Sequence, residues 1–312
     1  MKWFKNTLRD LYANRIWLMF VLPATIWFII FSYLPMIGHV IAFKDFRIHR
    51  DGFFASLWHS EWVGFKNFEF LFKTNVAWEI TRNTILYNLV FIFLGLFLAV
   101  AFAIGLSLLA NKKLTKIYQT GMLFPHFLSW VVVSYFVMTF LSTDRGAINS
   151  LLSFFGVEAI SWYYEPIYWP FILVFMAMWK GVGYQMIVYL AAIVGIDRSY
   201  YEAAMIDGAS KWQQIRHITI PMITPLMMIL TIMNIGRIFY SDFGLFYQVT
   251  QNSGALYDVT NTIDMYVYNG LTTLGDMSMT AAAGFYQSVV GFALVIITNY
   301  VVKKVDEDYA LF

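Results

Sequence analysis

Long apolar runs separated by short polar connections dominate the chain. A helix needs about 20 apolar residues to cross the ~30 Å hydrocarbon core of a bilayer. Six segments reach that length, and they cover approximately residues 16–43, 83–110, 118–141, 166–196, 221–240 and 280–302. The pattern therefore predicts an all-α membrane protein with six transmembrane helices, in which a single membrane domain (16–312) follows a short N-terminal segment (1–15).

Charged residues are scarce and unevenly placed. They make up 13% of the 312 residues, about half the share found in soluble proteins, which argues against a soluble enzyme or a nucleic-acid binder. Twelve of the 21 Lys and Arg residues lie in the N-terminal segment, after the second and fourth runs, and in the C-terminal tail. Cytoplasmic loops are enriched in these residues, so both termini are expected in the cytoplasm.

Two stretches do not read as simple spans. Residues 44–82 are polar but rich in aromatic residues, which predicts either a folded cap outside the membrane or an aromatic belt at headgroup level. Residues 237–279 mix aromatic residues with four aspartates, and short re-entrant or interfacial helices are expected there. In the fourth and sixth runs, Gly181, Gly183, Gly284 and Gly291 favour close helix approach.

The loop 198–220 between the fourth and fifth runs has helical character of its own. Good helix formers fill 198–207, and Gly208 can end that helix in a left-handed conformation. A second short helix fits 209–217, and Pro221 suits the first turn of the next span. The result is an L-shaped helix pair whose apolar side chains the loop cannot bury, so a cytoplasmic protein partner is expected.

The same loop resembles a known family. Glu202-Ala203-Ala204, Gly208 and Ile218-x-Ile220-Pro221 resemble the "EAA" coupling motif of ATP-binding-cassette importer permeases, with Ile220 where the family has Leu. Ile206-Asp207-Gly208-Ala209-Ser210 and Trp62-Val63-Gly64-Phe65-Lys66-Asn67-Phe68 are similar to the carbohydrate-type branch, above all to the first permease of oligosaccharide and alginate importers.

The resemblance implies a type I importer permease in the bacterial inner membrane. Its expected partners are a second permease, two ATPase subunits that bind ATP and Mg, an extracellular solute-binding protein and a sugar. Contact with the ATPase is expected from Glu202, Ala203, Ala204, Asp207, Gly208, Ile218 and Pro221. Glu202 would accept a charge-assisted bond from a partner arginine; the alternative is a solvated charge on a helix face.

The chain shows no nucleotide, metal or nucleophile motif. Gly270 and Gly275 have the spacing of a phosphate-binding loop, but Asp276 stands where the lysine is needed. The five histidines are not at metal-ligand spacing, and there is no cysteine. We therefore expect no cofactor, metal or catalytic residue in this chain. The alternatives are an importer permease for amino acids or peptides, a secondary transporter, which usually shows internal repeats, and a membrane enzyme, which would need acids within the spans.

Two basic residues fall within or beside the apolar runs, and such residues mark functional sites by default. Lys180 lies near Trp179, Tyr184 and Gln185, and Arg237 lies near Asn234, Tyr240 and Asp242. Aromatic rings beside amides and charges suit a saccharide, so these eight residues are candidates for the transport path. The alternatives are an ion pair between Arg237 and Asp242, or side chains that reach toward the headgroups.

Overall fold

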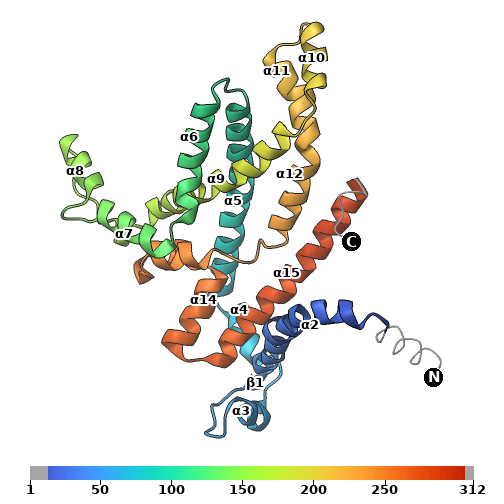
Figure 1. Ribbon diagram of the computed structural model, residues 1–312. Coiled ribbons are helices and arrows are strands. Elements are labelled where there is room, and N and C mark those ends of the chain that lie inside the picture. Colours follow the sequence, from blue (N-terminus) through green and yellow to red (C-terminus); the bar gives the residue numbers. More distant parts are fainter. Residues whose placement is uncertain (1–12, 306–312) are drawn as a thin grey trace.

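Helices built on the apolar runs form the body of the protein (Figure 1). The computed structural model describes residues 13–305. Five segments in this range are long and apolar enough to cross a bilayer, namely Arg15–Phe43, Val76–Ser107, Pro166–Val194, Lys211–Ile235 and Met277–Lys304. The predicted all-α membrane fold is confirmed. The N-terminal segment lies largely outside the described residues.

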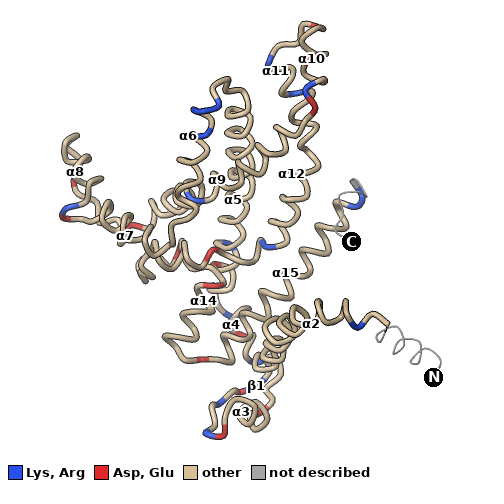
Figure 2. Tube along the Cα trace, in the orientation of Figure 1, with Lys and Arg blue, Asp and Glu red and all other residues tan. Residues whose placement is uncertain are grey.

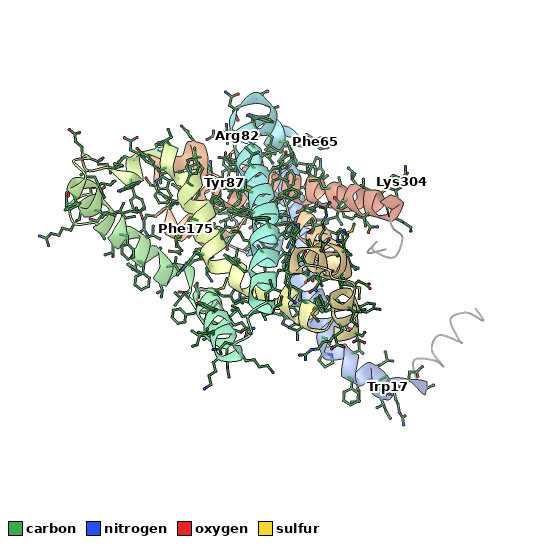
Figure 3. The ribbon with its side chains drawn as sticks, turned by 90° about the horizontal axis from the view of Figure 1, so that it is seen from above. Trp17, Phe65, Arg82, Tyr87, Phe175 and Lys304 are labelled. Carbon is green, nitrogen blue, oxygen red and sulfur yellow. The ribbon has the colours of Figure 1, made fainter. Side chains whose placement is uncertain are left out.

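The first segment stands apart from the other helices. It consists of α2 (Arg15–Phe28), the π turn η1 (Ile29–Tyr33) and the 3-10 helix η2 (Leu34–Phe43). No side chain of α2 is buried, and the view from above shows Trp17 well away from the helix bundle (Figure 3). Only the end of the segment, at η2, packs against α15 (Met277–Val305).

The largest helix interface joins α5 (Val76–Ser107) to α9 (Trp169–Val194). Small side chains on α5, such as Ala99 and Ala103, are fully buried there against Met186 of α9. Small residues let helices approach closely, and close packing replaces the hydrophobic driving force that lipid removes. α12 (Ile220–Ile235) joins the same core through Ile223.

The third predicted span, 118–141, is a pair of helices with a bend between them. α6 (Lys112–Leu123) and the 3-10 turn η4 (Phe124–Phe127) meet α7 (Trp130–Phe140) at a bend of 96°. Pro125 lacks the backbone N–H that would continue the helix, and the Ser129 hydroxyl caps the next one by accepting a hydrogen bond from the Val132 N–H (3.3 Å). The two halves make a sixth crossing only as a broken pair.

A short helical loop follows α7, comprising α8 (Ala147–Phe154), η5 (Trp162–Tyr164) and η6 (Pro166–Tyr168). Asn149 is buried at its centre. Its amide donates to the carbonyls of Thr143 (3.2 Å) and Ile160 (2.9 Å), and its oxygen accepts from the Trp162 indole (3.0 Å). One side chain therefore holds both ends of the loop together.

Replacing Asn149 by alanine should lower the free energy of unfolding by about 2 kcal/mol, because buried carbonyl and indole groups lose their partners. The measurement is the thermal unfolding of the purified protein in detergent. Ser150→Ala is the matched control, since that hydroxyl donates only to the Gly146 carbonyl of its own helix. Equal melting of N149A and the wild type would contradict this role.

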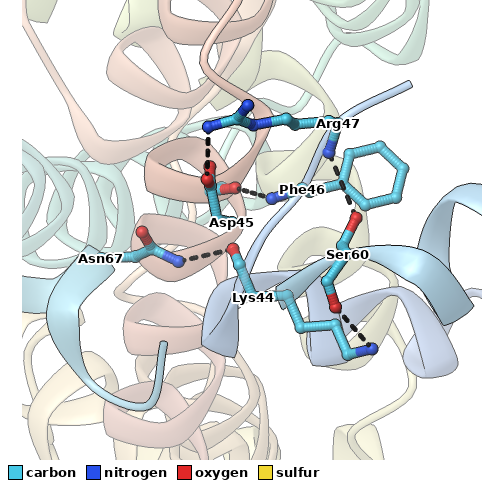
Figure 4. Close-up of polar contacts among 7 residues, drawn as sticks. Lys44, Asp45, Phe46, Arg47, Ser60 and Asn67 are labelled. Carbon is cyan, nitrogen blue, oxygen red and sulfur yellow. Dashed lines mark hydrogen bonds and ion pairs between the residues drawn. The ribbon is translucent and has the colours of Figure 1, made fainter. Parts of the chain in front are cut away.

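Residues 44–73 form a folded cap at the end of the molecule opposite α10 and α11 (Figure 1). It holds α3 (Phe53–His59), η3 (Lys66–Phe68), α4 (Glu69–Lys73) and a two-residue antiparallel pair, β1 (Lys44–Asp45) with β2 (Glu61–Trp62). The Asn67 amide donates to the carbonyls of Ala42 and Lys44 at 2.9 Å, and Figure 4 shows the bond to Lys44. The Phe46 N–H donates to Ser278 of α15 at 2.9 Å. These bonds show that the segment is folded, and its position outside the membrane stays a prediction.

Short helices fill 245–274 as expected, namely η8 (Leu245–Val249), η9 (Gly254–Leu256), α13 (Tyr257–Thr260), α14 (Ile263–Asn269) and η10 (Gly270–Leu274). Leu245 and Phe246 of this region are completely buried. α5 holds the segment in place, because the Asn83 amide donates to the carbonyls of Asp258 and Asn261, both at 3.1 Å. The largest apolar side chains thus face the core, while Asp258 and Asp276 are exposed and Asp264 is half-buried.

Candidate functional site

The loop after α9 forms one tip of the molecule (Figure 1). It contains α10 (Arg198–Ile206), α11 (Lys211–Gln214) and the π turn η7 (Ile215–Thr219). Asp197 caps α10: its carboxylate accepts a hydrogen bond from the Ser199 N–H (2.9 Å), which lowers the pKa of Asp197. A charged carboxylate at this position also favours the helix through its dipole.

Gly208 forms the turn at the tip. Its φ is +78°, a left-handed conformation that glycine adopts without strain. The Ala209 N–H donates to the Ala204 carbonyl (2.8 Å) and the Gly208 N–H to the Met205 carbonyl (3.1 Å). These two bonds are the Schellman pattern, which satisfies carbonyls left over at a helix end. The predicted helix stop at Gly208 is confirmed.

The second arm of the tip runs directly into the membrane helix. Pro221 lies in the first turn of α12, as predicted, and helical structure is nevertheless continuous over Lys211–Ile235. The proline has no N–H to donate within an α-helix, and the wider π turn η7 immediately before it accommodates that loss. The Tyr201 and Thr219 hydroxyls, 3.0 Å apart, tie α10 to η7.

The tip presents apolar and acidic side chains to solvent. Ile206 is 87% exposed and Trp212 67%, as predicted for a surface that the loop cannot bury by itself. Among the predicted coupling residues, Ile218 packs into the core beside Ile223. Ala204 is half-buried. The remaining coupling residues are exposed, namely Glu202, Ala203, Asp207, Gly208 and Pro221.

A second group of candidates lies around Lys180, which is the central residue of the span Pro166–Val194. Its ammonium donates to the His126 carbonyl (2.9 Å) and lies 5.3 Å from the centre of the Trp130 ring. Lys180, Trp130, Gln185 and Asp242 line one cavity of about 260 Å³. The bend between η4 and α7 therefore brings a ring and a carbonyl to the lysine.

Asp242 is held by neutral donors. One carboxylate oxygen accepts from the Trp130 indole (2.8 Å) and the other from the Leu245 N–H (3.3 Å). Asp242 also lines a second cavity of about 390 Å³ together with Arg237, Tyr240 and Ser241. The ion pair considered for Arg237 and Asp242 is absent, since their charged atoms do not come within 4.0 Å.

Six of the eight predicted path residues gather around these two cavities. Lys180, Gln185, Arg237, Tyr240 and Asp242 line them, and the Tyr184 ring stacks on His126 at 4.8 Å. Trp179 and Asn234 are exposed and line neither cavity. His126 and Trp130 were missed. Pro125 beside them was the available signal, because a break in the third run exposes its flanking residues to a neighbouring helix.

Comparison with known proteins identifies the family. Residues 91–307 match the model of the binding-protein-dependent transport system inner membrane component. The chain belongs to this family. The matched range contains the tip and the lining residues of the two cavities, so these features lie in the part of the chain that the family shares.

Curated relatives of this transport component include two proteins of Bacillus subtilis (strain 168). Protein LplB is 34% identical over 94% of this chain and 90% of its own length. The polygalacturonan/rhamnogalacturonan transport system permease protein YteP is 34% identical over 97% of this chain and 92% of its own length. Both matches extend over almost the whole of each protein.

Solved structures show the same arrangement. A chain of a bacterial ABC transporter that imports the acidic polysaccharide alginate matches with a TM-score of 0.86 and 30% identity, covering 96% of this chain and 99% of that one. The alginate transporter in complex with a periplasmic protein that holds an alginate pentasaccharide matches with a TM-score of 0.84. The predicted importer-permease fold is thereby confirmed.

Proposed function

We propose that this chain is a permease subunit of an ATP-driven importer of oligosaccharides. It forms half of the path, and a second permease forms the other half. Two ATPase subunits bind ATP and Mg, and an extracellular solute-binding protein delivers the sugar. The relatives named above support the carbohydrate class, and one solved relative is in complex with a sugar-loaded periplasmic protein.

The tip formed by α10 and α11 is the observation that carries this proposal. It combines exposed apolar residues, an exposed acid and a rigid glycine turn, and η7 joins it without a break to α12. A partner that moves the tip therefore moves a transmembrane helix directly. ATP binding closes the two ATPases, the tip follows, and the permeases change from inward-facing to outward-facing. Hydrolysis resets them.

Basic residues support a cytoplasmic position for the tip. Lys and Arg residues of α6, α10 and α11 lie at the same end of the molecule (Figure 2). Positive charge favours the cytoplasmic side. In this proposal the tip faces the ATPases and the cap of residues 44–73 lies outside. The Lys and Arg residues of the N-terminal segment and the C-terminal tail support a cytoplasmic position for both termini.

Glu202→Arg should lower ATP-driven uptake about tenfold, because it replaces a charge-assisted contact with repulsion. The assay is oligosaccharide uptake into proteoliposomes that contain the whole complex, with and without ATP. Lys116→Glu is the matched control, a charge reversal of a residue on α6. Full uptake by E202R would overturn the coupling role. Uptake that needs no ATP in the wild type would overturn the importer proposal itself.

A further inference from the structure

We propose that Lys180 and Arg237 select a negatively charged oligosaccharide, and that each side chain binds a carboxylate of the sugar. The inference rests on the proposed function and names the substrate class of the same path. It follows from the absence of ion pairs around the two cavities. Neither cation lies within 4.0 Å of a carboxylate in the described chain, and the hydrogen bonds to Asp242 and Asp264 come from neutral donors.

Lys180 forms no ion pair in the described chain. An ammonium carries three N–H donors, and the partners of this one are a single backbone carbonyl and the face of Trp130. Both contacts orient the charge without neutralising it. Lys180 is about 21 Å along the helix from either end of its span, too deep for its side chain to reach the headgroups.

The two nearby acids, Asp242 and Asp264, accept hydrogen bonds that hold neighbouring segments in place. Asp242 accepts from the Trp130 indole and the Leu245 N–H, which fixes Trp130 above Lys180 and caps the start of the following turn. Asp264 accepts from the Ser241 N–H (2.6 Å) and hydroxyl (2.7 Å) and from the Gln287 amide (3.1 Å). Neither carboxylate is within ion-pair distance of Arg237 or Lys180 among residues 13–305.

The backbone around Arg237 is held as firmly as the acids. The Asn88 amide of α5 donates to the carbonyls of Ile238 (3.0 Å) and Tyr240 (3.1 Å), which fixes the turn that carries Arg237. The guanidinium is therefore presented by a rigid turn at the wall of the larger cavity. A guanidinium binds a carboxylate through two parallel hydrogen bonds, which gives geometric as well as electrostatic preference.

The two cavities together suit a chain of acidic sugars. They are neighbours, since Asp242 lines both, and one holds Lys180 while the other holds Arg237. Trp130 and Tyr240 offer aromatic faces, and Gln185 offers an amide for sugar hydroxyls. A neutral sugar would leave Lys180, at the centre of its span, without an ion pair, which is unfavourable inside a membrane. A uronate oligosaccharide would supply carboxylates to Lys180 and to the exposed Arg237.

The test is equilibrium binding to the whole complex, without nucleotide, in lipid nanodiscs. Isothermal titration calorimetry compares a uronate trisaccharide, trigalacturonate, with the neutral trisaccharide made by reducing its carboxyl groups. Wild type should bind the uronate at least about tenfold more tightly, the effect of one charge-assisted contact. Lys180→Gln and Arg237→Gln should each remove most of this preference. Lys180→Arg should retain it, and Lys113→Gln, a matched loss of charge on α6, should leave it unchanged.

Several outcomes would overturn the inference. Equal affinity of wild type for the two trisaccharides, or no measurable binding of either, would do so. A preference that survives in the double variant K180Q/R237Q would assign the charge recognition elsewhere. An acid of the second permease that neutralises Arg237 would appear as a loss of complex assembly in R237Q. The proposed function is judged separately, because ATP-dependent uptake of the neutral trisaccharide would support an importer even if the charge preference is absent.

Discussion

Substitution of Gly208 by valine is expected to lower ATP-driven uptake by about tenfold to a hundredfold, while the complex still assembles. A β-branched residue at a φ of +78° carries about 1–3 kcal/mol of backbone strain. No described atom lies within 4 Å of a Cβ built at Gly208, so the effect is conformational. The strained turn would abandon the Schellman bonds and redirect α10 relative to α11. The measurement is uptake and ATP hydrolysis in proteoliposomes.

Two further variants separate coupling from general strain. Gly156 has a φ of +76° and equally open surroundings in the described chain, but it lies in the loop after α8. Gly156→Val should therefore show the same strain and near-normal coupling. Gly208→Asn should retain more uptake than Gly208→Val, since asparagine tolerates the left-handed region. Equal losses in G156V and G208V would contradict a special role of the tip.

The tip is the part of the protein that the sequence predicts best, because its signals are local. The left-handed glycine at position 208 and the helix before it depend on residues within one turn of each other. The continuation of α11 into α12 was not foreseen, because Pro221 usually marks a helix start. Only the π turn η7, a feature without a sequence signature, allows the helix to pass through.

The bend at Pro125 was missed for a different reason. Hydropathy measures whether a segment prefers lipid, and 118–141 does so throughout. Hydropathy does not measure whether the helix axis changes direction within the segment. The proline and the capping serine at position 129 were visible in the sequence, but a transmembrane helix often tolerates proline when neighbours satisfy the freed carbonyls. The 96° turn therefore depends on packing against α9.

The candidate path depends on contacts that no local pattern encodes. The sequence placed Arg237 five residues from Asp242 and left an ion pair open as the explanation. Asp242 is instead bonded to Trp130, 112 positions away in the chain. That long-range contact orients the carboxylate of Asp242, which forms no ion pair with Arg237, and no local sequence pattern predicts it.

Gly183→Ala is expected to have the largest effect of all, a loss of the folded complex. A Cβ at position 183 would lie 1.8 Å from the Met122 carbonyl oxygen, which belongs to the helix backbone and cannot rotate away. Overpacking of this kind destabilises by about 3 kcal/mol or more. The clash would also push η4 away from Lys180, one turn earlier on α9, and so open the smaller cavity. The measurements are the yield of monodisperse complex and its thermal unfolding.

Gly284→Ala provides the matched control within α15. In the described chain nothing lies within 4 Å of a Cβ at that position, and alanine favours a helix over glycine by about 1 kcal/mol. The sequence predicts close helix approach at both Gly183 and Gly284, yet the structure predicts opposite signs for their substitution. A normal yield of G183A would mean that α6 and α9 separate at little cost. In that case the packing of Met122 on Gly183 would not be what holds His126 and Trp130 against Lys180.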